Sequence, residues 1–595
     1  MPITAQNKTT TLIRGGDGIA RSYDTNGEFV SQLGKQVVTL HPTQNTTINT
    51  PTLVQFGFPF PRNECISAVD VKVQTVNGID IPCYIEKTLN WENFDGSALK
   101  FVRSVSITIE TTFTNTVDTQ QVVVVYGEGT SPTPLSVHTA TSTWVNYRTS
   151  GIQWGTFDNI DAARRPEYDY DGTGYGEPLE VIMEPATWAT LPQLYIRQCE
   201  VFTPYISEGG SNNSDDIETF LEFYRESSKS MTNELGVHVT EPNMNPYMTS
   251  NGAEIGGVEE GYTAWLFDRA TAVYSMYGLT GDLKWLIQGH RAATFYESKL
   301  TDGYLTLKTS VNDPKYSYIQ PMMIDTQLCG NTDLLQQVPD ILLLHDTFEH
   351  DYQFLTGGTK LFTERHAAYK LGAYVSAFEV TGDGSYATQA QDIVNSLYNL
   401  QQTPVNGWAK DGSIRHTLNA HESFGGDIPI GSPWMASLLS NELLRYYRHS
   451  GDVKALTIMQ DLGTWIINHG WRTYDYGVGI GVLKLPWYLA SDSFGSSNGV
   501  NGTDDIYNDV SHAFDVASLM ARAAWAQKRL GNDNTAAVNL YNDFMATAAY
   551  KFRDLHRTGQ ETIDAGKTVW RLAPTRIYNW WFTAGTYIIG LQERF

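Results

Sequence analysis

The sequence has few charged residues, few cysteines and no long apolar run. Charged residues make up 18% of the 595 positions, and basic residues are the scarcer kind, with 41 against 65 acidic ones. The resulting net charge of −24 repels nucleic acids and anionic membranes, so we expect neither as a main partner. No stretch reaches the roughly 20 apolar residues of a membrane-spanning helix, so we expect no membrane insertion.

The four cysteines, Cys65, Cys83, Cys199 and Cys329, are scattered along the chain. They show neither paired metal-binding spacing nor a disulfide framework, so we expect buried free thiols. The first residues contain no apolar run and no small-residue cleavage pattern, which predicts that a secretory signal peptide is absent. We therefore expect either a cytoplasmic protein or one released by lysis as part of a virus particle.

The first third of the sequence has the pattern of β-strands. Its apolar residues alternate with polar ones in two runs, at Val69, Val71 and Val73 and at Val105, Ile107 and Ile109. This period of two is typical of half-buried strands. The dipeptides Asn77-Gly78 and Asp95-Gly96 are turn signals between such runs. The sequence therefore predicts an antiparallel β-sandwich.

The later part of the sequence has a helical period and a repeated turn. The turn joins two helical stretches and has the form Thr/Ser-Gly-Asp, at residues 280–282, 381–383 and 450–452, with looser copies at 356–358 and 530–532. Glycine accepts the left-handed conformation that ends one helix, and aspartate caps the next. Repeated helix hairpins predict an α-helical array. We expect long loops between the hairpins, over residues 236–257, 303–337, 403–430 and 470–506.

Together these patterns predict a multidomain α+β protein. We place an N-terminal arm, a candidate attachment segment, at residues 1–40, the β-sandwich at 41–190 and the helical domain at 191–595. Because long loops suit a closed ring with a binding face better than an open solenoid, the helical domain is predicted to be an (α/α)6-type toroid.

Part of the β-half resembles a known family. Residues 56–62 read FGFPFPR, and residues 91–101 read WENFDGSALKF. This order resembles the N-terminal β-sandwich of exo-acting rhamnogalacturonan lyases, with one residue inserted before Asp95 and with Phe101 in place of the usual tryptophan. The helical half resembles the (α/α) toroids of polysaccharide lyases and glycoside hydrolases. The resemblance implies a carbohydrate-active enzyme whose reaction takes place in the toroid.

Candidate catalytic residues lie in the polar segments around the expected helix starts. Arg415, His416 and His421 form the densest polar group, in which arginine neutralises a substrate carboxylate and histidine transfers a proton. His512 stands three residues from both Asp509 and Asp515, a spacing that places both carboxylates on its helix face. In both segments the alternative is a structural cluster that satisfies backbone and side-chain hydrogen bonds.

Two tyrosines and a glutamate complete the catalytic candidates. Tyr507 and Tyr262 are candidate acids for the leaving oxygen in a lyase. Glu260, beside Glu259, and the pair Asp504 and Asp505 offer carboxylates for a hydrolase. Acidic residues at a helix start also interact favourably with the helix dipole, which is the structural alternative for Glu260.

Tryptophans near the loops are candidate platforms for sugar rings, although about half of such aromatics are expected to fill the core. These candidate substrate-binding residues are Trp265, Trp408, Trp434, Trp487, Trp580 and Trp581.

One segment nearly matches a twelve-residue calcium loop. Asp169, Asp171, Thr173 and Glu180 occupy ligand positions 1, 3, 5 and 12, with glycine at position 6. The alternative is a glycine-rich solvent loop. We expect no required cofactor, and structural Ca²⁺ is the one candidate ion.

The sequence-level hypothesis is a polysaccharide lyase that acts by β-elimination on a uronate-containing glycan. Glycoside hydrolysis on the same toroid is the runner-up, since the negative charge argues mildly against an anionic substrate. The Thr/Asn/Gly-rich, cysteine-poor composition also suits a bacteriophage tail depolymerase, with other virion proteins or further copies of the chain as partners. A non-catalytic glycan-binding virion protein is the third hypothesis.

Overall fold

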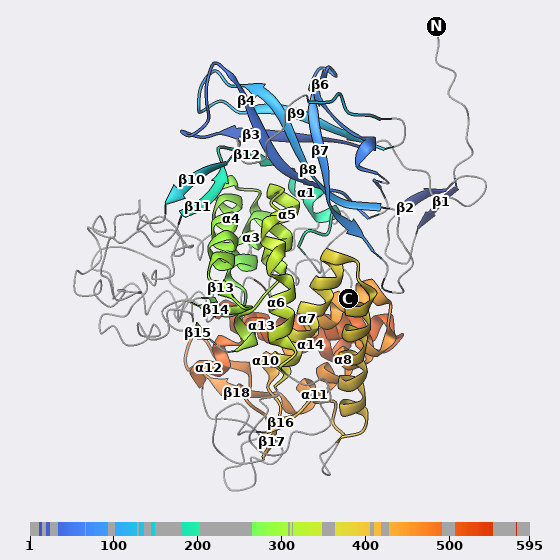
Figure 1. Cartoon of the computed structure of the whole chain (residues 1–595). Helices are drawn as coiled ribbons and strands as arrows, with labels where there is room; N and C mark the ends of the chain where they lie inside the picture. The colour runs from blue at the N-terminus through green and yellow to red at the C-terminus, as the bar shows by residue number, and fades with distance from the viewer. Residues whose placement is uncertain are drawn as a thin grey trace.

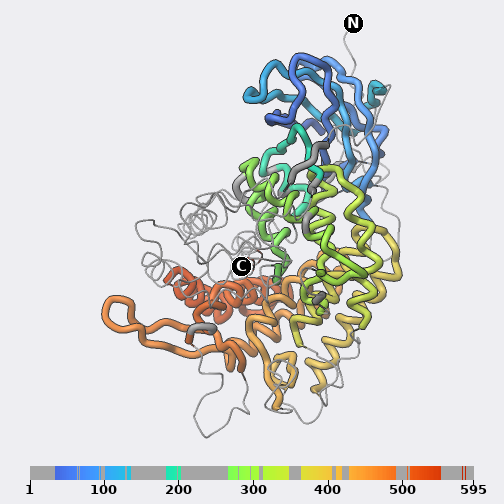
Figure 2. The backbone as a smooth tube through the Cα atoms, turned by 60° about the vertical axis from the view of Figure 1, so that its left-hand side comes forward, coloured from blue at the N-terminus to red at the C-terminus, as the bar shows by residue number. Residues whose placement is uncertain are grey.

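The structure is a computed structural model, and it describes part of the chain. The described residues are 11–14, 20–23, 34–62, 64–65, 67–92, 94, 101–127, 130–135, 144–148, 181–202, 265–306, 310–311, 313–347, 363–404, 410–417, 428–490, 506–550, 579 and 583. Within them the fold is mixed α+β with antiparallel sheets, and the strands of the two largest sheets precede the α-helices (Figure 1). Figure 2 shows the main sheets at one end of the molecule and the helices at the other.

The β-half contains a five-stranded sheet in the order β12-β3-β9-β5-β6 and a three-stranded sheet in the order β4-β8-β7. The first sheet consists of β12 (Thr187–Thr190), β3 (Gly34–Pro42), β9 (Gln120–Tyr126), β5 (Val71–Thr75) and β6 (Asp80–Ile81). The second consists of β4 (Pro51–Pro59), β8 (Phe101–Thr112) and β7 (Cys83–Trp91). Strand β3 begins inside the segment 1–40, which the sequence had suggested as an arm.

The predicted half-buried pattern holds for β5, whereas in β8 the apolar residues are buried as predicted but the polar residues between them are buried too. Val105, Ile107 and Ile109 are fully buried, as is Val73 of β5. Val69 differs from the prediction, because it lies in the short 3-10 helix η1 (Ala68–Asp70) and is 66% exposed. At Asn77-Gly78, the predicted turn joins β5 to β6, and Gly78 has the positive φ of 82° that such turns require.

Strand β8 is buried on both faces. Ser104, Ser106 and Thr108 are as buried as the apolar residues between them, so the three-stranded sheet has a second covered side. That side faces helix α5 (Gln320–Cys329), where the Gln55 amide donates to Ser106 Oγ and to the Gly330 carbonyl, at 3.0 and 3.3 Å. The sheet is therefore a shared layer between the sandwich and the helices.

Gly57, in the FGFPFPR segment, allows α5 to approach β4. A Cβ atom at this position would lie 2.4 Å from the carbonyl oxygen of Gln327, a separation that no side chain tolerates. The glycine of the family-like segment thus has a packing role at the contact between sheet and helix.

Most of the helical half is built from paired helices. These are α3 (Arg269–Thr280) with α4 (Leu283–Ser298), α7 (Glu364–Thr381) with α8 (Gly384–Gln402), α10 (Pro433–Ser450) with α11 (Val453–His469), and α13 (Ala513–Arg529) with α14 (Thr535–Tyr550). Shorter helices are α1 (Gln193–Gln198), α6 (Val338–His345), α12 (Ile506–Ser511), η8 (Pro314–Tyr316) and η9 (Asp333–Gln337). None of the described helices has the length and apolar character needed to cross a membrane.

The glycine of the repeated turn has the predicted geometry in all three close copies, and the aspartate cap forms in two of them, since Asp282 makes no cap hydrogen bond. Gly281, Gly382 and Gly451 end their helices with φ of 71°, 71° and 66°. Asp383 and Asp452 cap the next helices by accepting hydrogen bonds from backbone N–H groups two residues ahead. The prediction of helix hairpins is confirmed at these turns, because cap chemistry depends only on local residues.

The segment 303–337 differs from the predicted loop. It contains α5, in which all ten residues are buried. A helix buried on every side shows no amphipathic period, and its glutamine, aspartate and threonine residues made it resemble a polar loop.

Several two- and three-stranded ribbons complete the described structure. They are β1 (Thr11–Arg14) with β2 (Ala20–Tyr23), β10 (Trp144–Arg148) with β11 (Val181–Pro185), β13 (Leu300–Thr301) with β14 (Tyr304–Thr306) and β15 (Ser310–Val311), β16 (His416–Thr417) with β17 (Pro429–Ile430), and β18 (Trp471–Asp475) with β19 (Val482–Pro486).

A buried ion cluster joins the sheet to the helices. Glu379 of α7 accepts from Arg103 of β8 at 3.0 Å and from Arg445 of α10, and it contacts His449 at 2.9 Å. The Glu379 and Arg103 side chains are each only 1% exposed. Burial alone would raise the pKa of Glu379, but Arg445, Arg103 and His449 outweigh it and hold that pKa well below its usual range.

The cluster continues into the sandwich through Trp91. Arg103 and Arg62 lie over the Trp91 ring, at 4.6 and 4.7 Å from its centroid, and the indole N–H donates to the Phe60 carbonyl at 3.2 Å. The tryptophan that begins the second family-like segment is therefore part of the junction.

Substituting Glu379→Gln should strongly destabilise the protein. The change keeps the side-chain size but leaves two buried guanidinium groups without their shared carboxylate, a loss of about 3–5 kcal/mol in similar buried pairs. Thermal unfolding followed by circular dichroism measures the effect as a large fall in Tm. Asp80→Asn is the matched control, because Asp80 pairs with Lys72 at the surface and its loss should hardly change the Tm. Equal Tm values for both variants would contradict a stabilising role for the cluster.

Candidate functional site

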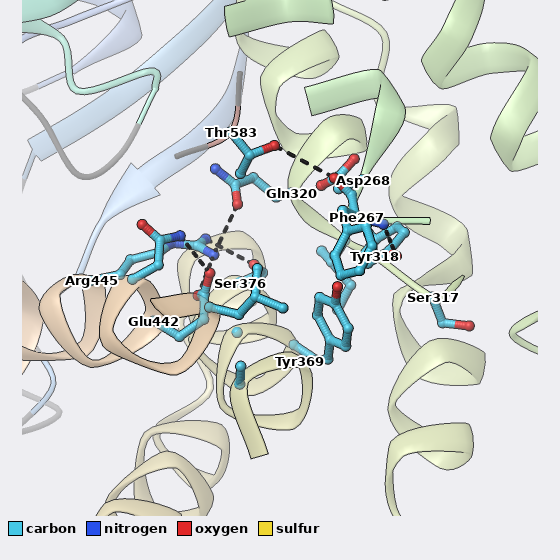
Figure 3. A pocket seen from close by; sticks show the side chains of 16 residues that line it. Phe267, Asp268, Ser317, Tyr318, Gln320, Tyr369, Ser376, Glu442, Arg445 and Thr583 are labelled. Atoms are coloured by element: carbon cyan, nitrogen blue, oxygen red, sulfur yellow. Dashed lines mark hydrogen bonds and ion pairs between the residues drawn. The ribbon is translucent and has the colours of Figure 1, made fainter. Parts of the chain in front are cut away.

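A pocket opens between the starts of α3 and α5 and the middle of α7 and α10 (Figure 3). Its empty volume, including the part open to solvent, is about 560 Å³. Asp268 and Glu442 provide carboxyl groups, Arg445 a guanidinium group, and Tyr318 and Tyr369 aromatic rings. The pocket therefore combines two acids, one cationic group and flat apolar surfaces, a mixture that is typical of small-molecule sites.

Asp268 lies in a strained turn that begins α3. Phe267 and Asp268 both adopt the left-handed conformation, with φ of 67° and 55°, which costs a non-glycine residue roughly 1–3 kcal/mol. The turn is held by the Tyr318 hydroxyl, which accepts from Phe267 N–H at 2.9 Å, and by the Asn579 amide, which donates to the Leu266 carbonyl at 2.7 Å. Such strain is concentrated at functional sites, which makes this turn a candidate.

Glu442 is oriented by three neighbours. The Asn441 amide donates to one of its carboxyl oxygens at 3.0 Å, and Arg445 donates to the other at 3.4 Å. Gly372 of α7 leaves the space that this carboxyl group occupies, since a Cβ there would lie 2.8 Å from Glu442 Oε2. The Glu442 carboxyl group is therefore held in one place on the pocket wall.

Both acids have raised pKa values. Burial raises the pKa of Asp268 to about 7, and the negative charge of Glu442 adds to the rise, whereas Thr271 and Arg445 oppose it. Burial also raises the pKa of Glu442, partly offset by Arg445 and Asn441. An acid that titrates near neutral pH beside a second, positioned carboxyl group can give and take protons.

Arg445 connects the pocket to the ion cluster. It donates to Ser376 Oγ at 2.8 Å and approaches Gln320 Oε1 at 3.5 Å, while it also pairs with Glu379. The position of the pocket's guanidinium group is therefore set by the junction between sheet and helices.

The sequence-predicted residues Arg415 and His416 are buried and engaged. Arg415 pairs with Asp411 and donates to Ser413 Oγ at 2.9 Å. His416 lies in β16, and its Nδ1 is 2.6 Å from Glu364 Oε2. These contacts are those of the structural alternative, and the catalytic assignment of both residues stays a prediction.

His512 and Trp434, predicted separately, lie together. Their rings stack with centroids 4.9 Å apart, and Tyr488 stacks on Trp434 at 5.8 Å. Asp515 Oδ2 contacts His512 Nδ1 at 2.9 Å, as the spacing predicts. The Trp434 ring also contacts Phe267 of the pocket, at 5.9 Å between centroids.

Asp509 does not share the face of His512. The chain leaves α12 at Ser511, and His512 precedes α13 with non-helical angles, so one continuous helix does not carry all three residues. Asp509 instead pairs with Arg472 at 2.5 Å and accepts from the Tyr488 N–H at 2.7 Å. The prediction of two carboxylates on one helix face is wrong for Asp509.

The remaining described candidates are aromatic. Trp265 is 1% exposed and stacks on Tyr296, and Trp487 is 6% exposed beneath the Arg472 guanidinium group at 4.4 Å. Both lie in the hydrophobic core, the alternative given for such residues. Tyr507 belongs to α12, and nothing is described of its side chain.

Other predicted residues lie outside the described part of the chain. They are His421, Tyr262, Glu260, Trp408, Trp580, Trp581 and the calcium-loop residues Asp169, Asp171, Thr173 and Glu180. Their assignments stay predictions.

Sequence reasoning missed the two pocket acids. Glu442 and Arg445 are three residues apart in an amphipathic helix, a pattern that equally describes a surface ion pair. Asp268 follows Trp265-Leu-Phe, where an N-cap is the ordinary interpretation. The sequence offers one signal for Asp268, an acidic residue directly ahead of an apolar helical run. The burial of its carboxyl group and the strain of its backbone cannot be read from the sequence.

Asp268→Asn should change the pH dependence of stability. In the unfolded chain an aspartic acid loses its proton near pH 4, whereas folded Asp268 keeps it up to about pH 7. Between these values the folded state binds more protons, so wild-type stability should fall with rising pH relative to the variant, by on the order of 4 kcal/mol. Above pH 7 the difference should be constant.

Urea unfolding of both proteins across pH 4–8 measures this difference. Asparagine retains the N-cap acceptor, so a change in the cap does not confound the comparison. A difference between the two proteins that is flat with pH would refute the raised pKa of Asp268.

Comparison with known proteins gives distant structural similarity only. No family model and no curated protein matches the chain. An unsaturated glucuronyl hydrolase specific for heparin has a TM-score of 0.44 and 11% identity, over 63% of this chain and 98% of its own. An unsaturated glucuronyl hydrolase from Streptococcus agalactiae has a TM-score of 0.39 and 13% identity, over 65% and 97%. At these TM-scores the similarity establishes neither fold nor substrate.

Proposed function

We propose that this protein is a glycan-degrading enzyme that hydrolyses a glycosidic bond in the Asp268–Glu442 pocket. The observation that carries the proposal is the pair of positioned carboxyl groups, one of which has a pKa of about 7. Glycoside hydrolysis commonly uses two carboxyl groups of unequal pKa, one as acid and one as base or nucleophile.

In the proposed reaction, Asp268 protonates the glycosidic oxygen as the bond from that oxygen to the anomeric carbon breaks. Glu442 takes a proton from the water that attacks the anomeric carbon. The products are a free reducing end and the released alcohol, so one water is consumed for each bond cleaved. Arg445 and Asn441 keep Glu442 in place, and Tyr318 and Tyr369 provide ring faces for the sugar.

The sequence patterns support the same class of substrate. The family-like segments around Gly57 and Trp91 resemble those of glycan-cleaving enzymes, and both have junction roles in this chain. We propose further that the helix hairpins belong to an (α/α) toroid of the polysaccharide lyase and glycoside hydrolase type, and that the pocket lies in its interior.

A lyase remains the second candidate because of His512. An imidazole held by Asp515 and stacked against Trp434 is an arrangement that suits proton removal from a sugar ring. In β-elimination the base would remove the C5 proton of a uronate and an acid would protonate the leaving oxygen, which leaves an unsaturated sugar.

Incubation with capsular and pectic polysaccharides, and with oligosaccharides prepared from them, tests the proposal. Reducing ends and near-ultraviolet absorbance are followed together. Hydrolysis is expected to raise reducing ends alone, whereas a rise in both identifies the lyase. Glycan binding without either change would contradict both enzymes and favour the binding protein of a phage tail.

Two matched variants separate the two sites. Asp268→Asn should lower kcat/KM by roughly 10²–10⁴-fold, the usual contribution of acid–base catalysis, with the Tm at the assay pH retained or raised. His512→Gln should have a much smaller effect if the proton donor is Asp268. The reverse order of effects would transfer the chemistry to the His512–Trp434 stack.

The place of action is also a proposal. A phage-tail depolymerase would act while assembled with other virion proteins or further copies of the chain, and this suggestion rests on composition alone. Detection of the protein in purified particles, rather than in the cytoplasm of uninfected cells, would support it.

A further inference from the structure

Three potential metal ligands meet in the core, on the side of the helical half that faces the β-strands. His290 of α4 and Asp325 and Cys329 of α5 each offer one donor atom, and these atoms lie within 4.8 Å of one another. Asp325 and Cys329 are four residues apart, one helical turn, so both point to the same side of α5. All three side chains are almost completely buried.

The hydrogen bonds of His290 leave Nδ1 directed at the other two ligands. Its Nε2 lies 2.8 Å from the carbonyl oxygen of Met183 in β11. Since a carbonyl only accepts, Nε2 carries a proton. A carboxylate also only accepts, so without a metal a second proton lies between Nδ1 and Asp325, and Nδ1 gains a lone pair for a metal ion when that proton leaves. Nδ1 is 2.7 Å from Asp325 Oδ1. Metal-binding histidines typically donate their second N–H to a carbonyl or carboxylate in this way.

Asp325 supplies an independent observation. Its Oδ1 accepts from the Tyr274 hydroxyl and contacts His290, whereas its Oδ2 is buried and has no hydrogen-bond partner among the described residues. A buried carboxylate oxygen without a partner is costly, and a bound cation would satisfy it.

We propose that His290, Asp325 and Cys329 bind a structural Zn²⁺ ion. The mixture of imidazole, carboxylate and thiolate donors suits zinc and not Ca²⁺ or Mg²⁺, which require oxygen ligands. A tetrahedral zinc holds its donors roughly 3.3–3.8 Å apart, and the three donor atoms here lie within 4.8 Å of one another. The Tyr274 hydroxyl donates to Asp325 Oδ1 and lies 4.0 Å from Cys329 Sγ, so a further oxygen atom adjoins the three ligands.

The charges also balance in this dry environment. One thiolate, one carboxylate and a neutral imidazole carry two negative charges, which the ion cancels. Binding releases two protons to solvent, the thiol proton of Cys329 and the proton between His290 Nδ1 and Asp325 Oδ1, with no oxidation or reduction. Because the ligands are closed off from solvent, the ion would tie α4, α5 and, through Met183, strand β11 together, and would take no part in catalysis.

The metal content of the purified protein tests the proposal directly. Full-length protein from zinc-supplemented medium should contain one zinc per chain by mass spectrometry after dialysis. After removal of zinc, titration with Co²⁺ alone should produce the visible d–d bands of a tetrahedral site and a thiolate-to-cobalt charge-transfer band. Removal of the metal should lower the Tm, and Zn²⁺ should restore it.

Two cysteine variants test whether the metal binds at Cys329. Cys329→Ser removes the proposed ligand, and Cys199→Ser is the matched control. Both cysteines are buried free thiols, and Cys199 lies elsewhere, next to the Pro59 carbonyl. The Cys329→Ser variant should lack the charge-transfer band and should bind Co²⁺ at least tenfold more weakly than the wild type. The Cys199→Ser control should keep both the band and the wild-type affinity. Wild-type protein with substoichiometric zinc, no thiolate band and a Tm insensitive to chelator would overturn the proposal, and that result does not depend on whether the variants fold.

Discussion

The shared carboxylate of Glu379 is the constraint on which the arrangement of the two halves depends. Two arginines, one from the three-stranded sheet and one from α10, enter a region with almost no solvent, and Glu379 is the carboxylate that they share. A buried charge is costly unless it is paired. Directional ion pairs fix orientation more sharply than apolar contacts. The cluster therefore determines the orientation of the sheet on the helices. The contact at Gly57 determines the distance between β4 and α5.

The candidate site inherits its geometry from that junction. Arg445 cannot move toward a ligand without weakening its pairing with Glu379, so the guanidinium group is preorganised and its position costs nothing at the moment of binding. The strained turn at Phe267 and Asp268 is fixed from a different direction, by Tyr318 and Asn579. Two rigid supports, one at each side of the pocket, hold the acids in place.

Local features of this fold were predictable from the sequence, and features that depend on tertiary contacts were not. The Thr/Ser-Gly-Asp turns and the burial pattern of β5 follow from rules that involve a few neighbouring residues. Helix α5 was not predicted, because its burial on all sides removes the amphipathic pattern by which a helix is recognised. Glu442 and Arg445 were not predicted as site residues, because a buried ion pair and a surface ion pair have the same spacing along a helix. His512 and Trp434 were each identified, but their stacking depends on two helices that meet only in the folded chain.

The separation of Arg103 and Glu379 along the chain has a consequence for biosynthesis. The two residues are 276 positions apart, and at about 5–20 residues per second a ribosome needs roughly 15–55 s to make the intervening segment. The last sandwich strand, β12, is complete at Thr190, yet the side of β8 that meets α5 and α7 lacks its cover until those helices are made. Because the sheet is made before the helices that cover it, we expect this surface to need rapid burial or protection by a chaperone during synthesis.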